Sequence, residues 1–381
     1  MQSSRLTTQP VFYDKWFVLT VAAIIALGFL MMASASVMIS ERQFHQSFHY
    51  LYRQLAYLSL GILLGTAVIR MPILQWEKIG SYLLVTVVVL LGLVLIPGIG
   101  HSANGSSRWI GVGPLGFQVS ELAKLTTVIY MAGYLLRRNL EIRSHLSGFI
   151  KPMVILSVIA MLLLKEPDFG ATVVIMVTAL GMMFLAGMRL QHFLLLLVLV
   201  LAALAVIAIS APYRLLRLTS FLNPWANPFD SGYQLTQSLI AFGRGGWFGV
   251  GLGKSIQKLF YLPEAHTDFL FAVIAEELGL LGMLVVVALF TLLVVRIFYI
   301  GRKAQMLGKH FAGFLAYGFG LWMAIQFIVS IGVNSGMLPT KGLTLPLMSY
   351  GGNSILITCL VIALLLRIDY ESRIAEIGLR R

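Results

Sequence analysis

Long apolar runs separated by short polar segments dominate the chain, and about 20 apolar residues are needed for a helix to cross a bilayer. Ten runs approach or exceed this length. They cover residues 17–39, 53–70, 79–97, 118–136, 147–165, 168–187, 190–210, 270–298, 311–333 and 351–367. The pattern predicts an all-α polytopic membrane protein with ten transmembrane helices, which places both termini on one side. We expect a single membrane domain over 1–381, with tails at 1–16 and 368–381.

Composition supports a chain that folds in lipid. Its mean hydropathy is +0.89, and only 11% of its 381 residues are charged, far fewer than the surface of a soluble domain needs. The single cysteine, Cys359, lies in an apolar run, so it forms no disulfide within this chain and is predicted to be a buried small hydrophobe. The net charge of +13 comes without a basic surface interleaved with aromatic residues, so we expect the bilayer and not nucleic acid as a partner.

Lys and Arg positions predict the orientation of the chain in the membrane. If the N-terminus is inside, the inner segments hold 17 of the 28 Lys and Arg residues. Because cytoplasmic segments carry an excess of these residues, both termini are predicted to be cytoplasmic. The longest connection, 211–269 between the seventh and eighth spans, is then extracytoplasmic, where no ATP is available.

Two short motifs and the histidines suggest chemistry that their contexts do not support. The run at 249–255 ends like a phosphate-binding loop, but Phe248 occupies the position where that motif needs glycine. The triplet at 168–170 spells the kinase magnesium motif without a glycine-rich strand or a catalytic loop. The seven histidines lack metal-ligand spacing, so a metal site stays unknown.

Charged residues at the edges of the apolar runs gather toward the predicted outer side. Glu121 and Lys124 are three residues apart, so they share one helix face and are able to pair. Arg108 lies in the loop before them, and Lys341 lies in the loop before the last span. Charges at such depth are costly and are functional candidates facing a polar cavity. A purely structural ion pair is the alternative for Glu121 and Lys124.

Other acidic residues have a structural alternative. Glu166 and Asp168 form a tight turn before the sixth span, where carboxylates complement a helix N-terminus, and we favour that structural role. Glu276 and Glu277 begin the eighth span and fit a structural or a functional role equally.

The 211–269 connection is too long to be an idle linker. Alternating basic and apolar residues at 213–218 predict a short helix in the headgroup layer, which 223–228 breaks. A second amphipathic helix is predicted at 233–240. The glycines of 243–253 permit tight turns and close backbone approach. We expect a folded lid that dips partly into the membrane beside the cavity.

Several strings together resemble one family. They are NPF (227–229), GYQ (232–234), QS (237–238), GRGG (243–246), LPEAHTDF (262–269), EELG (276–279), RW (108–109), Gln118, SELAK (120–124), EPDFG (166–170), LPTKGL (338–343) and SYGG (349–352). Jointly they resemble the SEDS family of cell-wall glycosyltransferases over nearly the whole chain. Residues 241–246 and 261–266 resemble the cell-division branch more than the elongation branch. Val119 and Asn353 depart from the family pattern, where proline and serine are common, and neither is a candidate charge.

The resemblance implies a reaction and a place in the cell. It implies polymerisation of lipid II, the undecaprenyl-diphosphate-linked disaccharide pentapeptide, into peptidoglycan at the outer leaflet for septal wall synthesis. It also implies a multi-pass protein of the inner membrane at the division septum. The implied partners are a class B penicillin-binding protein, which is a septal transpeptidase, and other membrane proteins of the division machinery.

The chemistry of sugar joining requires a base near the attacking hydroxyl and positive charge at the departing diphosphate. The resemblance implies that Asp268 is the catalytic base acting on the 4-hydroxyl of the acceptor, and inversion at carbon one fits a single carboxylate. The substrate-binding candidates are Arg108, Lys124 and Lys341, with Glu121 orienting Lys124, and Arg244, His266 and Glu264 as additions. The sequence identifies no cofactor; a divalent cation, Mg or Mn, at the diphosphate stays open.

Three other functions stay open at this stage: a lipid II flippase, an elongation-type polymerase and a noncatalytic scaffold of the division machinery. A transporter should expose polar groups to both faces and often contains repeats around broken helices. The sequence has no clear internal repeat, and its embedded charges crowd one side. These features favour the polymerase.

Overall fold

The computed structural model describes residues 13–98, 100–103, 106–111, 116–144, 147–209, 220–339 and 342–379. Its long helices are α1 (Lys15–Phe44), α2 (His49–Arg70), α3 (Ile73–Val94), α4 (Val119–Arg137), α6 (Ser147–Lys165), α7 (Phe169–Leu185), α8 (Leu190–Ile209), α11 (Leu270–Met306), α12 (His310–Asn334) and α13 (Gly352–Leu379). Two shorter helices are α5 (Asn139–Ser144) and α10 (Tyr233–Gly245).

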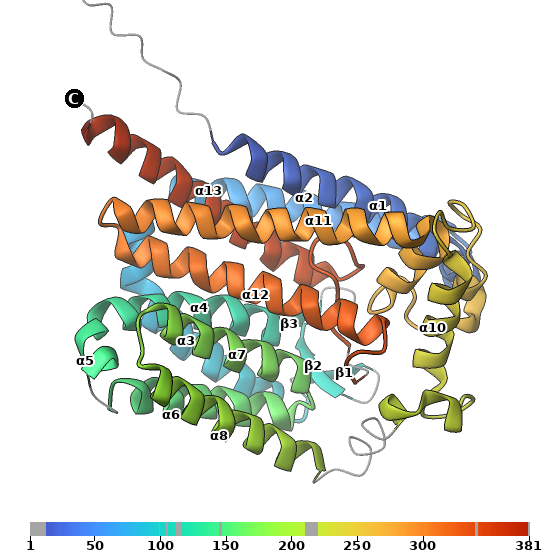
Figure 1. Cartoon of the computed structure of the whole chain (residues 1–381), viewed down its shortest axis with the longest axis horizontal. Helices are drawn as coiled ribbons and strands as arrows, with labels where there is room; N and C mark the ends of the chain where they lie inside the picture. The colour runs from blue at the N-terminus through green and yellow to red at the C-terminus, as the bar shows by residue number, and fades with distance from the viewer. Residues whose placement is uncertain are drawn as a thin grey trace, which may run out of the picture.

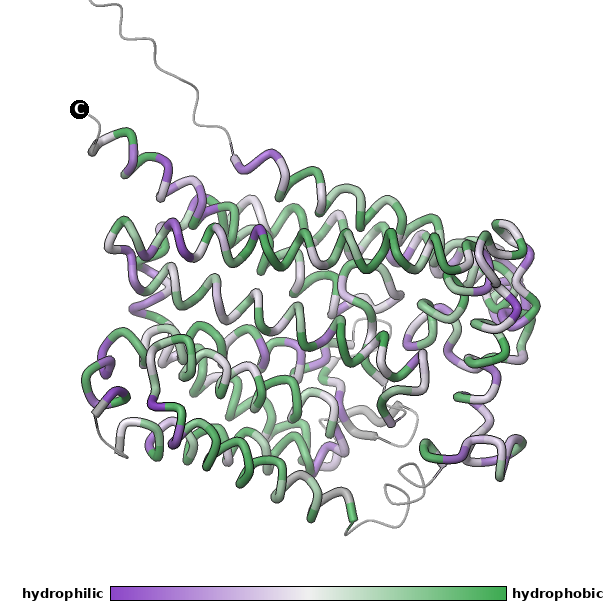
Figure 2. The backbone as a smooth tube through the Cα atoms, in the orientation of Figure 1, coloured by the Kyte–Doolittle hydropathy of each residue, from purple (hydrophilic) through white to green (hydrophobic). Residues whose placement is uncertain are grey.

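The long helices form one bundle (Figure 1). α1 begins and α13 ends at the same end of the bundle, which we call the terminal end. α10 lies across the opposite end, which we call the loop end. Hydrophobic residues cover the length of the helices, and hydrophilic residues concentrate at the two ends (Figure 2). This distribution is typical of a helical membrane protein.

Each of the ten predicted apolar runs coincides with one of the long helices. Over the described residues, seven helices are long and apolar enough to cross a membrane. α7 has 17 residues, and the apolar part of α8 is scored as a shorter helix over Leu190–Ala203. α4 has 19 residues but contains Glu121 and Lys124, which lower its hydropathy. A multi-helical membrane fold is therefore observed, while the count of ten spans and their orientation stay predictions.

The prediction of an all-α fold is wrong in one segment. The loop before α4 contains a three-stranded antiparallel sheet of β1 (Gly100–Ala103), β2 (Ser106–Ile110) and β3 (Phe117–Gln118) in the order β1-β2-β3. The sequence places Asn104-Gly105 between the first two strands, and this dipeptide is a strong hairpin signal. Analysis by apolar runs alone overlooks such short strands.

Small residues allow α2 and α13 to pack closely. A Cβ added at Gly61 would lie 2.9 Å from the Cβ of Cys359, and one at Gly65 would lie 3.4 Å from the Cβ of Ala363. These two glycines form a small-xxx-small pattern on α2, which permits close helix approach in lipid. Cys359 is free and buried in this contact, as its apolar context predicts.

The C-terminal helix continues beyond the predicted span, because polar contacts hold residues 368–379 against the bundle. Asp369 is buried, accepts a hydrogen bond of 2.7 Å from the backbone N–H of Asp14, and pairs with Arg373. Asp14 caps α1 and pairs with Arg296 of α11. The segment predicted as a tail is thus a folded continuation of α13 as far as Leu379.

The described part of the long connection before α11 is folded, and α10 confirms the amphipathic helix predicted at 233–240. A 3-10 helix (Pro224–Ala226) precedes α10, and a π-helical turn (Gln257–Tyr261) follows it. The helix predicted at 213–218 lies outside the described residues.

α11 is broken near its start. Gly279 has φ 65° and ψ −162°, a conformation open essentially to glycine alone. The carbonyls of Glu276 and Glu277, which the break releases from the helix, accept hydrogen bonds of 2.9 and 3.1 Å from the N–H groups of Val250 and Gly251. A Cβ at Gly279 would lie 2.3 Å from the backbone nitrogen of Gly249. Glycines therefore allow the loop after α10 to cross α11; the close backbone approach was predicted from the sequence for 243–253, but the crossing and the role of Gly279 were not.

Candidate active site

The segment after α12, residues 342–350, lies beside several of the predicted site residues; we call it the 342–350 loop. Asp268 precedes α11, and a Cβ added at Gly342 would lie 2.7 Å from the Oδ2 atom of Asp268. Gly342 thus leaves the room that this carboxylate occupies. The side chain of Asp268 therefore lies against the first residue of the loop. Lys341, the residue just before the loop, is outside the described residues.

His266 contacts the other end of the same loop. Its backbone carbonyl accepts a hydrogen bond of 2.9 Å from the N–H of Tyr350. Its ring lies 4.6 Å from the ring of Tyr50 and 5.6 Å from that of Tyr350, measured between centroids. Burial lowers the pKa of His266 from its usual value, and the carboxylate of Glu264 opposes this shift only in part. His266 is therefore neutral at neutral pH, and its contribution to binding would be a hydrogen bond without charge.

Lys124 is the most deeply buried of the predicted charges that the structure describes, with 2% of its surface exposed. Its Nζ donates to Glu121 Oε1 at 2.7 Å, so the predicted pair at i and i+3 is confirmed. It also donates to Oε1 of Gln326 at 3.2 Å, and Nε2 of Gln326 donates to the backbone carbonyl of Thr344 at 2.9 Å. Gln326 therefore connects the ammonium group of Lys124 to the 342–350 loop.

A cavity of about 10 Å³ adjoins Lys124 between α4, α7 and α12, with Trp322 in its wall. This volume is about the minimum that a single water molecule needs. Thr127 and Thr178 are among the residues that line the cavity, and the hydroxyl group of neither has a hydrogen-bond partner among the described residues.

Arg108 on β2 holds the turn between α6 and α7. Its guanidinium donates to the backbone carbonyls of Glu166 at 3.1 Å and Pro167 at 2.6 Å. This turn adjoins the 342–350 loop, because a Cβ added at Gly170 would lie 3.1 Å from a methyl group of Leu343. Arg108 therefore lies near the loop through the turn that it stabilises.

The two acidic residues of that turn differ. Asp168 caps α7 through a hydrogen bond of 3.1 Å from the N–H of Ala171, as predicted. Glu166 is fully buried, and neither oxygen of its carboxyl group has a partner among the described residues, so the capping role predicted for it is wrong. Burial and, to a smaller extent, the carboxylate of Asp168 raise the pKa of Glu166 to about 8, although the charge of Arg108 opposes the shift.

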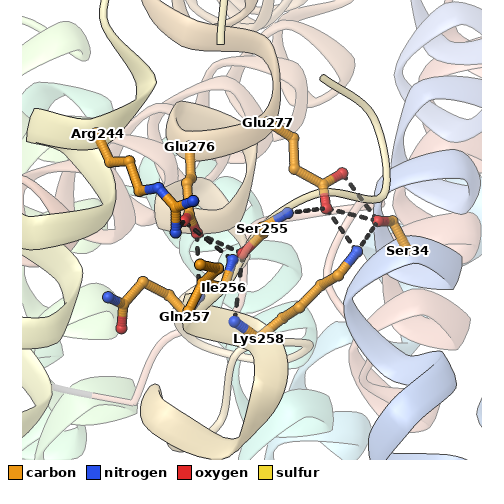
Figure 3. A network of polar contacts seen from close by, with 8 residues as sticks. All are labelled: Ser34, Arg244, Ser255, Ile256, Gln257, Lys258, Glu276 and Glu277. Carbon is orange, nitrogen blue, oxygen red and sulfur yellow. Dashed lines mark hydrogen bonds and ion pairs between the residues drawn. The ribbon is translucent and has the colours of Figure 1, made fainter. Parts of the chain in front are cut away.

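Arg244 belongs to a separate network (Figure 3). Its guanidinium pairs with Glu276 at 3.3 Å, and Glu276 also accepts hydrogen bonds from the N–H groups of Ile256 and Gln257. Glu277 accepts from Lys258 Nζ at 2.6 Å and from the hydroxyl of Ser34 on α1 at 2.8 Å. Both carboxylates are fully buried and fully partnered, which supports the structural role considered for them.

Glu264 has a positive φ of 56° and forms a turn. Its Oε2 accepts a hydrogen bond of 2.7 Å from the hydroxyl of Thr267, and its carboxylate influences His266 electrostatically. Among the described residues, no group of three or more His, Cys, Asp or Glu side chains is arranged to hold a metal ion. A divalent cation at a bound diphosphate therefore stays a prediction that these side chains alone do not support.

Three buried polar residues escaped the sequence analysis: Gln326 and Asn334 at the site, and Lys258 in the separate network. Asn334 ends α12, and its side chain donates to the backbone carbonyl of Asp268 at 2.8 Å. The available signal was an amide within an apolar run, since such residues commonly hydrogen-bond across helices in membranes.

Comparisons with known proteins identify the family of the chain. The family model described as "Cell cycle protein", FTSW_RODA_SPOVE, matches residues 14–374. The chain belongs to the SEDS family of FtsW, RodA and SpoVE. The family resemblance inferred from the sequence motifs is confirmed.

Curated relatives cover the chain almost completely. A protein of Legionella pneumophila is 57% identical over 380 residues, which is 100% of this chain and 96% of that protein. A protein of Coxiella burnetii is 56% identical over 360 residues, 94% of this chain and 97% of that protein. Both are named "Probable peptidoglycan glycosyltransferase FtsW", which confirms the predicted division-type branch.

Two solved structures share the fold of this chain. One, described as "Structural coordination of polymerization and crosslinking by a peptidoglycan synthase complex", has a TM-score of 0.79 at 29% identity and covers 94% of this chain and 98% of that chain. The rod shape determining protein RodA of Thermus thermophilus has a TM-score of 0.70 at 30% identity and covers 94% of this chain and 96% of that chain. This chain is thus a multi-pass membrane protein with a SEDS-type fold.

Proposed function

We propose that this chain is a peptidoglycan glycosyltransferase that polymerises lipid II at the outer leaflet of the inner membrane, for wall synthesis at the division septum. The observation that carries the proposal is the full-length identity of 57% to a relative named as such an enzyme. The geometry supports it, because a carboxylate and a buried cation are both connected to the 342–350 loop.

In the proposed reaction Asp268 is the general base. Its carboxylate accepts the proton of the acceptor's 4-hydroxyl while that oxygen bonds to carbon one of the donor sugar. The bond between carbon one and the diphosphate oxygen breaks, and the lipid diphosphate departs with the electron pair. A single direct displacement inverts carbon one, so one carboxylate is sufficient.

Positive charge is proposed to stabilise the departing diphosphate. Lys124 and Lys341 are the candidates, with Glu121 and Gln326 orienting Lys124. Arg108 is placed in a supporting role, because its guanidinium donates to two backbone carbonyls. Arg244 pairs with Glu276, so we assign it the role of holding the connection before α11, which carries Asp268.

We also propose a class B penicillin-binding protein as partner, together with other membrane proteins of the division machinery. Support comes from the similar solved structure, whose description names a peptidoglycan synthase complex that coordinates polymerization and crosslinking. In this assembly the transpeptidase would crosslink the strands that this chain polymerises.

Purified chain, with and without the partner, tests the proposal on lipid II in detergent or nanodiscs. Wild type should form glycan strands, and Asp268→Asn should form none while still binding the partner. Asp230→Asn is the matched control, because Asp230 is an exposed aspartate before α10. Unchanged product length and rate in Asp268→Asn would refute the assignment of the base.

The same assay separates polymerase from flippase. When lipid II is supplied already on the outer side of vesicles, a polymerase consumes it and a flippase leaves it monomeric. The break in α11 at Gly279 falls in the first third of a helix of 37 residues, nearer the loop end than the middle that transporters use.

A further inference from the structure

We infer that Asn334 is a positioning residue for Asp268: its buried carboxamide fixes the backbone of the proposed general base relative to α11 and α12. The inference rests on the proposed function and assigns it one more residue. Asn334 is the last residue of α12 and has 0% of its surface exposed. Its contacts join three segments that are distant in sequence.

Both donors and the acceptor of the Asn334 side chain are in use. Nδ2 donates to the carbonyl of Asp268 at 2.8 Å and to the carbonyl of Ser330 at 2.8 Å. Oδ1 accepts from the N–H of Ala272 at 3.1 Å. If the amide were reversed, its oxygen would face two carbonyl oxygens, so the network permits a single orientation. The residue is therefore held in one conformation.

This arrangement supplies the cap that α11 lacks. Phe269, the residue before α11, provides no side-chain hydrogen bond to the helix start. Helix N-termini leave their first N–H groups without a partner four residues back. The N–H of Ala272 is one of these, and it donates both to the side-chain oxygen of Asn334 from a different helix at 3.1 Å and to the carbonyl of Phe269 at 3.0 Å. The same amide holds the residue just before the cap, which is Asp268.

The surroundings keep both partners in register. The backbone carbonyl of Asn334 accepts a hydrogen bond of 2.6 Å from the hydroxyl of Ser238 on α10, which is fully buried. On its other side, the carboxylate of Asp268 lies against Gly342. The backbone of Asp268 is thus fixed by α12, and its side chain is limited by the 342–350 loop. A displacement of about 1 Å at a reacting group costs about 100-fold in rate, so this fixation matters for a base.

A test must separate positioning from a mere helix cap. Asn334→Asp keeps the oxygen that caps α11 and removes the donors to Asp268 and Ser330. Asn334→Leu removes both functions at similar volume. Asn353→Leu is the matched control, since Asn353 is a buried amide on α13 that donates to the carbonyl of Gly116.

Hydrogen exchange of residues 262–272 provides a readout independent of catalysis. The bonds from the Asn334 side chain to the backbone of Asp268 and Ala272, which we call the clamp, restrain local opening of this segment. We therefore expect exchange about tenfold faster in Asn334→Leu and no change in Asn353→Leu. Unchanged exchange in Asn334→Leu would overturn the clamp, whether or not the purified chain makes glycan.

Kinetics on lipid II at pH 8 then test the consequence. Asn334→Asp should lower kcat about 10- to 100-fold with KM within about twofold. In an Asp268→Glu background, whose carboxylate is already displaced, the same change should cost less than about threefold. Equal losses in both backgrounds, or wild-type kcat in Asn334→Asp, would overturn the positioning role. If wild type makes no glycan while exchange responds as expected, the proposed function fails and the clamp stands as a structural contact.

Discussion

Two groups of buried carboxylates near the loop end have opposite environments. Glu276 and Glu277 sit where the loop after α10 crosses α11, and each accepts several hydrogen bonds from backbone or side-chain donors. Glu166, in the turn beside the 342–350 loop, has no partner for either oxygen among the described residues. Position near a helix start does not distinguish the two groups; the supply of donors does. The partnered group stabilises the fold, whereas the other stays able to bind or release a proton.

The largest expected effect comes from removing one partner of the crossing network. Glu277→Leu leaves the ammonium group of Lys258 buried without its carboxylate, which should cost about 3–5 kcal/mol of unfolding free energy. Thermal unfolding in detergent measures the loss. The double variant Lys258→Met with Glu277→Leu should recover most of it, because both charges of this pair are then removed. Equal stability of the single variant and wild type would contradict the structural role.

The next effect tests the break in α11 on which that crossing depends. Gly279→Ala forces a side chain onto a φ of 65° and into the backbone of Gly249, so we expect a loss of about 2–4 kcal/mol. Gly243→Ala is the control, because Gly243 lies in α10 and an added Cβ meets nothing within 4 Å. The same thermal measurement should show the control unchanged or slightly more stable.

A smaller and more local effect is expected at Gly342. A Cβ there would lie 2.7 Å from Oδ2 of Asp268 and would push the carboxylate aside. Gly342→Ala should lower kcat on lipid II about 10- to 100-fold while changing stability by less than about 1 kcal/mol. Gly92→Ala, which meets nothing within 4 Å in α3, should keep wild-type kinetics. A variant with full activity would show that the carboxylate is not confined by the loop.

The unpartnered carboxyl group should reveal itself through pH. The pKa of Glu166 is raised from 4.5 to about 8, mainly by burial, so the folded chain holds a proton in this range that the unfolded chain releases. Its contribution to stability is therefore complete below about pH 4.5 and is lost as pH rises through about 8. The melting temperature of the wild type should therefore fall as pH rises from 5 to 8, and Glu166→Gln should make this fall shallower. An equal slope in both proteins would exclude a raised pKa.

The smallest effect concerns the cavity beside Lys124. Thr178→Val replaces a buried hydroxyl that has no partner among the described residues, so stability should rise by up to about 1 kcal/mol. Ser372→Ala is a useful contrast, because that buried hydroxyl donates to Ile368 at 2.7 Å and its removal should lower stability. A fall in stability in Thr178→Val would indicate that its hydroxyl is satisfied by bound water.

Features that depend on neighbours in sequence were predictable. Apolar length located each long helix, and spacing of three residues on one helix face located the pair of Glu121 and Lys124. The cap formed by Asp168 follows from its place before an apolar run. Each of these depends on one helix or one turn, so elementary periodicity is sufficient.

Features that depend on distant segments were not predictable. The partner of Glu277 is Lys258 at the crossing, and nothing in the order of residues indicates that these two side chains meet. Gln326 and Asn334 were missed because only charged residues were weighed within the apolar runs, although amides serve the same purpose across helices. The extension of α13 required knowledge of Asp14, which contacts Asp369 of this helix and pairs with Arg296 of α11 only in the folded chain.

The break at Gly279 gives α11 the properties of two coupled rods. The long rod after the glycine is tied at the terminal end through Arg296 and Lys303, whereas the short rod before it is tied to α10, α12 and the crossing loop. The N–H groups of Leu280 and Leu281, which open the long rod, donate to the carbonyls of Gly246 and Trp247, so the same loop is bonded to both rods. The joint is therefore splinted from outside the helix, and the aspartate ahead of the short rod starts from a backbone anchored on two sides.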